Sequence, residues 1–381
     1  MSRQQINFSS NPILSLLAYL QNKQRKNTQN LISLTPAKMK HGEVIIVVYD
    51  VVLVVLSIAL IILGVLLFLC CKKKRPAVED DGNGCHKAAK LSAAAYTLTE
   101  MDAATDGFNP RRIIGKGRLG VVYSGVLPEG RGELVAVKRF HPRLVLSNAG
   151  AGFGFSSLLR WLSLADHPNL VPILGFSEAP GERIVLMEYG GMLSLEFYLH
   201  QNPDAAALLH WPRRVKVAAG VARGLEFLHE GMAPHIVHGC VKGSNVLIDV
   251  EFCARLCDYG LYFLASNERQ EVVGYVDEEY WGGGGGGSKE SDVYGFGVVL
   301  LELLSGRKSQ EGLLVKWALP LLKEMKFGEV LDPRLEIPCD INPLVRLAKV
   351  ASACVGNSRK SRPTIVQVAA ILNNLEIEFN L

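Results

Sequence analysis

A long run of uncharged residues constrains this chain more than any other feature. Residues 51–71 read VVLVVLSIALIILGVLLFLCC and contain no charged side chain. A helix of this length crosses about 30 Å of hydrocarbon. A buried core helix rarely stays apolar on every face for so long, and a cleavable signal peptide has a shorter apolar run that begins closer to the N-terminus. We therefore expect a single transmembrane helix within residues 44–71.

The residues on either side of this run predict its orientation. Three lysines and an arginine occupy positions 72–75, and the positive-inside rule places such a cluster in the cytoplasm. Residues 1–43 then form a short extracellular segment, which cannot build a ligand-binding domain of ordinary size. Residues 72–95 are expected to be a juxtamembrane linker. The predicted location is the plasma membrane, with the C-terminal part of the chain in the cytosol.

Charge and cysteine content limit the classes of function. The net charge is +4, but an excess of positive charge lies before residue 76. The remainder is net negative and lacks the basic field that a nucleic-acid-binding domain needs. All eight cysteines lie at or after Cys70, which predicts reduced cytosolic thiols and a disulfide-free N-terminal segment. Glycosylation at Asn7 and palmitoylation at Cys70 and Cys71 are left open by the sequence.

A glycine-rich hairpin opens the folded domain, which is expected to begin near residue 96. Gly115, Gly117 and Gly120 have the G-x-G-x-x-G spacing between two runs rich in β-branched residues. A dinucleotide-binding turn with the same spacing opens into a helix, whereas this chain continues as a strand. The loop is therefore predicted to cover phosphates as a hairpin. A later β-rich run ends at Lys138, at a distance that lets its ammonium reach the same phosphates.

Further motifs follow in a fixed order toward the C-terminus. The sequence HGCVKGSN covers residues 238–245, and Asp258-Tyr259-Gly260 follows after 12 intervening residues. Glu279-Tyr280, the run SDVYGFG at 291–297, and Arg362-Pro363 come later. Together with the glycine loop and Lys138, this order resembles that of protein kinases. The chain is most similar to plant receptor-like serine/threonine kinases of the group related to Pelle and interleukin-receptor-associated kinases.

The resemblance implies a bilobal α+β protein-kinase fold over residues 96–381, preceded by the single transmembrane helix. The small lobe is expected at about 96–190 and the large lobe at about 191–381. ATP and Mg²⁺ are the implied cofactors, and the implied Mg²⁺ ligands are Asn245 and Asp258. The implied ATP-binding residues are Ile114, Gly115, Lys116, Gly117, Arg118, Leu119, Gly120, Val121, Val122, Ala136, Lys138, Glu188 and Gly190.

The same resemblance assigns structural roles to residues of the large lobe. Glu279 is expected to pair with Arg362, Asp292 to brace the catalytic loop, and Lys242 to neutralise the γ-phosphate. Apolar periodicity predicts a helix that begins near Trp211. The run at 293–304 is apolar almost all round, which predicts a helix buried at the centre of the lobe rather than a second membrane span.

The catalytic loop departs from the family at two positions. Cys240 stands where the family has the Asp that accepts the substrate proton. A thiol with a pKa of about 8.5 is mostly neutral at pH 7 and hydrogen-bonds weakly, so the substrate hydroxyl loses its orienting carboxylate. Gly239 stands where kinases that are switched by activation-loop phosphorylation have an Arg. That switch is therefore expected to be absent.

Lys138 is also expected to lack its usual partner. No Asp or Glu lies between Arg139 and Ala165, although the helix Glu that pairs with this lysine in kinases falls there, near Leu158. Without that carboxylate the lysine is less well oriented, and the active arrangement of the lobes is less favoured.

Three losses in one site predict a pseudokinase. We expect a membrane-anchored kinase fold that binds ATP weakly, with assistance from Mg²⁺, and acts in signalling. Its predicted partners are other receptor kinases or cytosolic signalling proteins, which it contacts in an ATP-modulated way. The alternatives are an active serine/threonine kinase with an atypical catalytic loop, and a small co-receptor or scaffold that binds no nucleotide.

Overall fold

The structure is a computed structural model that describes residues 51–59, 92–127, 132–147, 154–265, 272–281, 286–310 and 312–380. The chain divides into two units, residues 1–86 and 87–381. In the first unit, residues 51–59 are helical and their side chains are exposed. Among the residues in these ranges, no helix combines the length and the apolar character needed to cross a membrane. The rest of the predicted span, Asn7, Cys70 and Cys71 lie outside the described residues.

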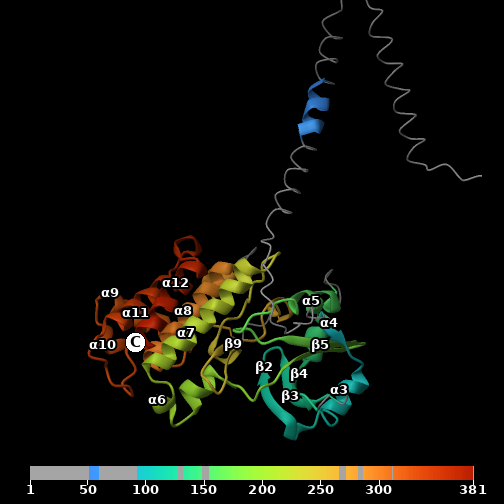
Figure 1. Ribbon diagram of the computed structural model, residues 1–381, viewed down its shortest axis with the longest axis horizontal. Helices are drawn as coiled ribbons and strands as arrows, with labels where there is room; N and C mark the ends of the chain where they lie inside the picture. Colours follow the sequence, from blue (N-terminus) through green and yellow to red (C-terminus); the bar gives the residue numbers. More distant parts are fainter. Residues whose placement is uncertain are drawn as a thin grey trace, which may run out of the picture. The chain divides into compact units, whose positions relative to one another are not determined.

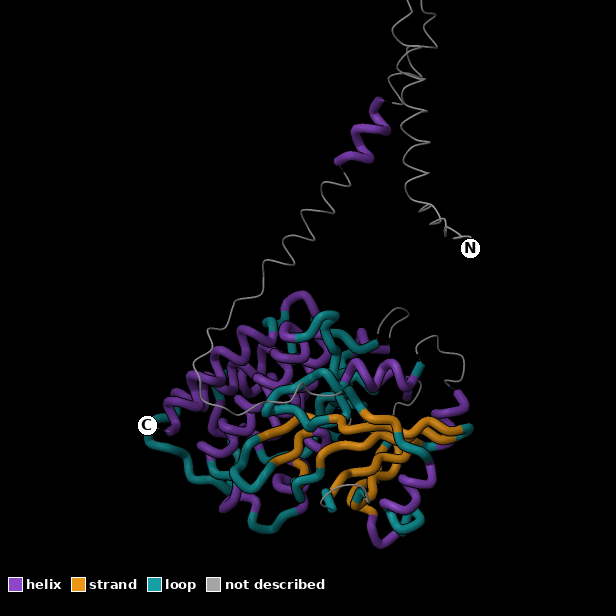
Figure 2. The backbone as a smooth tube through the Cα atoms, turned by 45° about the vertical axis from the view of Figure 1, so that its right-hand side comes forward, coloured by secondary structure: helices purple, strands orange, loops and turns teal. Residues whose placement is uncertain are grey.

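The second unit begins with a six-stranded sheet in the order β1-β5-β6-β4-β3-β2 (Figure 1). β1 pairs with β5 in parallel, and the other neighbours are antiparallel. Figure 2 shows these strands gathered at one end of the unit and the long helices at the other. The strands are β1 (Ala94–Ala95), β2 (Ile113–Gly117), β3 (Gly120–Val126), β4 (Leu134–Phe140), β5 (Ile173–Ala179) and β6 (Glu182–Glu188). Together with these strands, the small lobe contains the helices α3 (Leu98–Ala104), α4 (Pro142–Ser147) and α5 (Phe155–Leu162) and a 3-10 turn, η1 (Pro110–Arg112).

The alternation of side chains along β4 positions the functional lysine. Val135 and Val137 are fully buried in a cluster with Met101 of α3. Because successive side chains of a strand point to opposite faces, Ala136 and Lys138 lie on the other face, toward the cavity described below. The burial of Val135 and Val137 on one face of β4 therefore directs Lys138 from the other face toward the cavity.

The large lobe is mostly helical. Its helices are α6 (Ala205–Leu208), α7 (Trp211–Glu226), α8 (Lys289–Ser305), α9 (Leu313–Lys323), α10 (Phe327–Val330), α11 (Asn342–Cys354) and α12 (Ile365–Asn380). A small sheet in the order β7-β8-β9 consists of β7 (Leu193–Ser194), β8 (Val246–Ile248) and β9 (Ala254–Leu256). Short helical segments complete the large lobe. Two are π-helical, η2 (Phe197–Gln201) and η3 (Phe227–Gly231). The others are 3-10 turns, η4 (Gly243–Asn245), η5 (Tyr262–Ala265), η6 (Glu278–Trp281) and η7 (Arg359–Ser361).

Helix α8 forms the centre of the large lobe, as its apolar run predicts. Ser288 caps its N-terminus, since the hydroxyl accepts a hydrogen bond from the Ser291 amide at 3.1 Å. Gly306 ends the helix with a positive φ of 65°, a conformation that glycine adopts at little cost. Every residue from Val298 to Ser305 is buried. Helices α11 and α9 pack on α8, and α12 packs on α7 (Figure 1).

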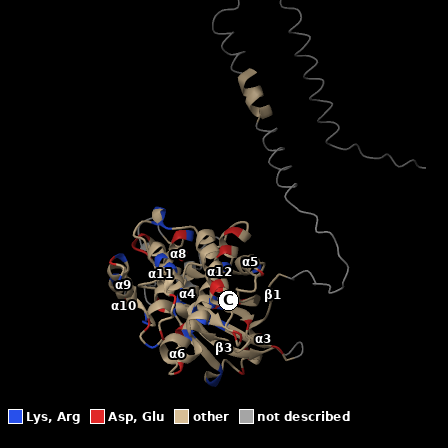
Figure 3. Cartoon of the chain, turned by 60° about the vertical axis from the view of Figure 1, so that its left-hand side comes forward, with Lys and Arg blue, Asp and Glu red and all other residues tan. Residues whose placement is uncertain are grey.

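A fully buried ion pair joins α7 to the segment after α10. Arg214 is 0% exposed, and its Nη2 donates to Asp332 Oδ2 at 2.7 Å. Its other nitrogens donate to the carbonyl oxygens of Leu303 at 2.6 Å and Leu209 at 2.7 Å. A buried guanidinium is stable only when paired and hydrogen-bonded in this way. Figure 3 shows positions of Lys and Arg interspersed with positions of Asp and Glu along the backbone of this unit.

Candidate active site

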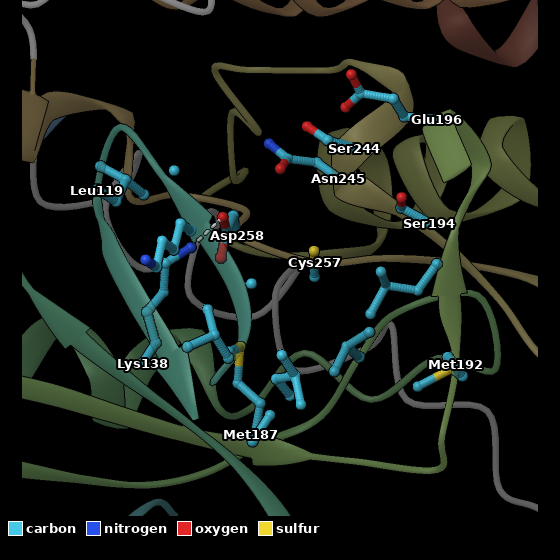
Figure 4. Close-up of a pocket in the computed structure, with 18 of the residues that line it drawn as sticks. Leu119, Lys138, Met187, Met192, Ser194, Glu196, Ser244, Asn245, Cys257 and Asp258 are labelled. Atoms are coloured by element: carbon cyan, nitrogen blue, oxygen red, sulfur yellow. Dashed lines mark hydrogen bonds and ion pairs between the residues drawn. The ribbon is translucent and has the colours of Figure 1, made fainter. Parts of the chain in front are cut away.

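A cavity of about 670 Å³ lies between the six-stranded sheet and the loops around β8. This volume is within the range of sites that hold small molecules and cofactors. Eleven of the thirteen predicted ATP-binding residues line it, together with Cys240, Lys242, Asn245 and Asp258. Figure 4 shows Lys138 and Leu119 on one side of this cavity and Ser244, Asn245 and Glu196 on the other.

Two predicted ATP-binding residues do not line the cavity. Val121 packs instead on the cluster that contains Met101 and Val137, because it alternates with Val122, which does face the cavity. Gly190 lies beyond β6, and a methyl group added there would meet no atom within 4 Å. Both residues match the family by position in the sequence, but neither contributes a surface to this site.

The carboxylate of Asp292 organises the catalytic loop from its place in the first turn of α8. Its oxygens accept hydrogen bonds from the backbone amides of His238 and Gly239, each at 2.7 Å. His229 Nε2 lies 2.9 Å from the same carboxylate. Because Asp292 is 1% exposed, these bonds are not in competition with water, and they fix the backbone that carries Cys240.

Cys240 lines the cavity, and its backbone is hydrogen-bonded on both sides, with its amide donating to His238 Nδ1 at 3.4 Å. Its carbonyl oxygen accepts a hydrogen bond from Asn245 Nδ2 at 2.9 Å, and the side chain is 6% exposed. Burial raises the pKa of the Cys240 thiol, although the positive charges of Lys242 and Arg118 oppose that rise. A neutral, buried thiol is a poor acceptor for a hydroxyl proton. Cys240 is therefore a poor base at neutral pH, although it stands where the family has the Asp that accepts the proton.

Gly239 is fitted to the ring of Tyr262. Its φ is +79°, and a β-carbon placed there would lie 2.1 Å from two ring atoms of Tyr262. A β-carbon at Gly287 would come within 2.7 Å of the same ring. The ring is thus held between two glycines, and it fills the space that any side chain at position 239 would need. The arginine that kinases with a phosphorylation switch carry at this position has no room here.

Lys138 pairs with Asp258 across the cavity (Figure 4). Burial alone would raise the pKa of Asp258, but the charge and hydrogen bond of Lys138 outweigh it and lower the pKa. Leu158, at the position where the helix Glu is expected, is 6% exposed and belongs to the apolar core. The lysine therefore takes its carboxylate partner from the position predicted to bind Mg²⁺.

The cavity offers groups that suit a nucleotide. Glycines, Ala136 and Met187 supply a narrow apolar slot, and Lys138 and Lys242 supply positive charge for phosphates. The expected metal ligands are an amide and a carboxylate, and that carboxylate is already paired with Lys138. Within the described residues, no group of three or more His, Cys, Asp or Glu side chains is arranged to hold a metal ion.

The expected pair between Glu279 and Arg362 is wrong. The Arg362 guanidinium pairs with Asp277, two residues earlier, and Arg359 binds the same carboxylate at 2.8 Å. The side chain of Glu279 is 54% exposed, and its nearest cation, Arg359, lies 4.0 Å away. Burial would raise the pKa of Asp277, but hydrogen bonds from Arg359 and Arg362 lower it. Arg362 pairs with Asp277 rather than with Glu279 because the Asp277 side chain, 3% exposed, faces inward.

Several cavity residues were not identified from the sequence. Met187, Met192 and Leu247 add apolar surface, and Cys257 lies beside the metal position with its pKa raised by burial. Ser244 lies inside the motif at 238–245, and Leu247 and Cys257 adjoin recognised motifs, so the places of these three residues could have been inferred. The others come from segments without a motif, and only the fold brings them to the cavity. They are Val171, Met187, Tyr189, Met192, Leu193, Ser194, Glu196, Phe197, Gln201 and Tyr262.

Comparisons with known proteins agree with this geometry. A family model described as protein tyrosine and serine/threonine kinase matches residues 108–372. The chain is 37% identical over 300 residues to the proline-rich receptor-like protein kinase PERK13 of Arabidopsis thaliana, covering 73% of this chain and 41% of that protein. It is 36% identical over 300 residues to the probable serine/threonine-protein kinase PBL6 of the same plant, covering 74% of this chain and 69% of that protein.

A solved structure shows the same similarity. The pseudokinase domain of BIR2, an immune regulator of the RLK/Pelle family, aligns with a TM-score of 0.62 and 30% sequence identity. The alignment covers 76% of this chain and 91% of that domain. The second unit therefore shares its fold with a solved pseudokinase domain.

Proposed function

The chain belongs to the protein tyrosine and serine/threonine kinase family and is a plant receptor-like kinase by similarity; from this premise we propose that it is a membrane-anchored pseudokinase. In this proposal the kinase fold transfers phosphate poorly or not at all. It acts in signalling through contacts with other receptor kinases or cytosolic proteins, and ATP modulates those contacts.

The buried Cys240 thiol is the observation that carries the proposal. Phosphoryl transfer requires a group that orients the substrate hydroxyl and accepts its proton. The thiol that stands in this place has a raised pKa and is 6% exposed. Loss of a general base typically costs about 10²–10⁴-fold in rate. The paired Lys138 and Asp258 add a second obstacle, since a metal-bound phosphate requires both residues in other roles.

Replacement of Cys240 tests this proposal directly. Cys240→Asp restores a carboxylate, and Cys240→Asn provides a control of the same shape without the charge. We expect Cys240→Asp to raise transfer of radiolabelled phosphate from ATP to the chain itself or to a generic protein substrate, alone or together with Leu158→Glu. Cys240→Asn should leave transfer at the wild-type level. If both variants equal wild type, Cys240 does not limit the reaction.

Nucleotide binding is part of the same proposal. The cavity, its glycine loop and Lys138 support ATP as the ligand. If ATP fails to bind, the chain is better described as a scaffold that uses the kinase fold only for protein contacts. If wild type transfers phosphate at ordinary kinase rates, it is an active kinase with an atypical catalytic loop.

The membrane anchor rests on the apolar run at 51–71 and its basic flank. Protease added to intact cells should trim only a short N-terminal segment, and an antibody against the C-terminus should still detect a protein that is shortened by that segment alone. Loss of the C-terminal domain in this experiment would reverse the proposed orientation.

A further inference from the structure

Residues 92–97, which we call the strap, run along the edge of the six-stranded sheet. Ala94 of β1 pairs in parallel with Gly175 of β5, and the Tyr96 amide donates to the Phe176 carbonyl oxygen at 2.8 Å. A β-carbon at Gly175 would lie 2.5 Å from the Tyr96 ring and 2.8 Å from the Ala94 carbonyl oxygen. The absence of a side chain at this glycine is therefore what lets the strap lie so close to β5.

The strap is also fixed to the C-terminal end of helix α5. The Ala93 amide donates to the Ser163 hydroxyl at 2.9 Å, and this hydroxyl donates to the Arg160 carbonyl oxygen at 2.8 Å. Ser163 is the C-cap residue of α5. Ala93 is 1% exposed and belongs to the same apolar cluster as Leu158 and Leu162 of α5. The strap thus ties the end of α5 to the edge of the sheet.

The same end of α5 contacts the motif that carries Asp258. A β-carbon at Gly260 would lie 2.6 Å from Leu162 Cδ2, so this leucine packs directly on the backbone of Gly260. Asp258 itself has a positive φ of 65°, a conformation that an L-residue keeps only where its surroundings hold it. The position of α5 therefore helps to hold Asp258 where it pairs with Lys138.

The strap has little buried surface of its own. Both residues of β1 are exposed, and so are Ser92 and Thr97. A short edge segment of this kind opens at a lower free energy than the strands and helices of the core. The bound and released strap are therefore two states of one element, and α5 is the part of the fold that this element contacts.

We propose that the strap regulates the nucleotide cavity through α5. With the strap bound, α5 holds Asp258 in its pair with Lys138, and the lysine is engaged. When the strap releases, the end of α5 loosens, Asp258 leaves the pair more often, and Lys138 becomes available to the phosphates of a nucleotide. This last step rests on the proposed nucleotide binding, whereas the control of Asp258 by the strap does not.

Hydrogen–deuterium exchange of the purified full-length chain, measured by mass spectrometry, tests the control of Asp258. Gly175→Ala places a methyl group against the strap. Gly328→Ala is the matched control, because a β-carbon at this exposed glycine would meet no atom within 4 Å. We expect Gly175→Ala to speed amide exchange by at least about tenfold both within 92–97 and within 257–260, since exchange follows local opening. Gly328→Ala should change neither segment.

Ser163→Ala is a second variant that leaves β5 untouched and decides the question if Gly175→Ala does not fold. It removes the hydroxyl that accepts the Ala93 amide, and Ser157→Ala, at an exposed position of the same helix, is its control. We expect faster exchange in the same two segments for Ser163→Ala and wild-type exchange for Ser157→Ala. If the folded strap variants exchange at the wild-type rate within 257–260, the strap only covers the sheet and the inference is wrong.

Equilibrium dialysis of radiolabelled ATP with Mg²⁺ tests the last step in the same proteins. Gly175→Ala should bind ATP at least about fivefold more tightly than wild type, the lower end of typical coupling between two sites. Gly328→Ala should bind it as wild type does. Equal or weaker binding by Gly175→Ala would overturn the regulation of the cavity. If no protein binds ATP, the proposed nucleotide binding fails, and exchange within 257–260 alone decides whether the strap controls Asp258.

Discussion

The contact between Gly239 and Tyr262 predicts a specific loss of stability when Gly239 acquires a side chain. Gly239→Ala adds one methyl group at a φ of +79°, and its β-carbon would lie 2.1 Å from the ring of Tyr262. The left-handed conformation costs an L-residue about 1–2 kcal/mol, and overpacking of a filled space costs about 1–3 kcal/mol more. The total expected loss is about 2–5 kcal/mol.

Gly181 provides a control that separates these two costs. Its φ is +75°, and a β-carbon there would meet no atom within 4 Å. Gly181→Ala should therefore lose only the conformational part, about 1–2 kcal/mol. The difference between the two variants measures the collision with Tyr262.

Thermal unfolding of the full chain, followed by tryptophan fluorescence, checks this prediction. Each kcal/mol lowers the melting temperature by about 2–4 °C in a domain of this order of size. The double variant Gly239→Ala, Tyr262→Ala should lose less than the sum of the single changes, because the methyl group then enters the space that the ring leaves. Equal losses for Gly239→Ala and Gly181→Ala, or strict additivity with Tyr262→Ala, would refute the reasoning.

Three further predictions concern charged groups. Lys138→Met should reduce the stabilisation of the folded chain by ATP, which for wild type is about 2.7 kcal/mol at a ligand concentration 100 times the wild-type Kd. If ATP shifts the melting temperature of this variant as much as that of wild type, Lys138 does not contribute to ATP binding. Arg214→Met leaves Asp332 with Arg334 as its remaining partner, but it leaves the buried carbonyl oxygens of Leu209 and Leu303 without their side-chain donor, and it should cost about 1–3 kcal/mol in a urea titration. Arg346→Met, at an exposed pair with Glu378, should cost about 0–1 kcal/mol in the same titration. The pKa of Asp277 is lowered in the folded state, so its carboxylate contributes stability above the unfolded-state pKa of about 3.9, and this contribution is lost as pH falls below that value. Asp277→Asn should therefore flatten the acid side of the profile of stability against pH. An unaltered profile would contradict the pairing of Asp277 with Arg359 and Arg362.

The order of motifs allowed the fold to be predicted, because each motif marks a separate part of the cavity. The alternation of β-strand side chains could have excluded Val121 as well, since Val122 and Val121 face opposite ways. The absence of an acid between Arg139 and Ala165 predicted that Lys138 lacks its helix partner. It did not predict the pair with Asp258, because a contact across the cavity depends on how the two lobes meet.

Two other features depend on three-dimensional packing that local sequence does not encode. Asp277 and Glu279 are both acids in one short motif, and only the direction in which each faces decides that Arg362 pairs with Asp277. Gly239 can be read from the sequence as the loss of an arginine. That Tyr262 fills the vacated space follows from the position of the turn η5 against the catalytic loop, which no spacing in the sequence specifies.

The rate of phosphate transfer by the wild-type chain is the most direct test of the central claim. Purified full-length protein, ATP labelled at the γ-phosphate and a generic serine/threonine substrate give this rate, with Cys240→Asp measured in parallel. The account predicts a wild-type rate at least about 100-fold below the usual 1–100 s⁻¹ of kinases, and a measurable rise in Cys240→Asp. A wild-type rate within the usual range would contradict it.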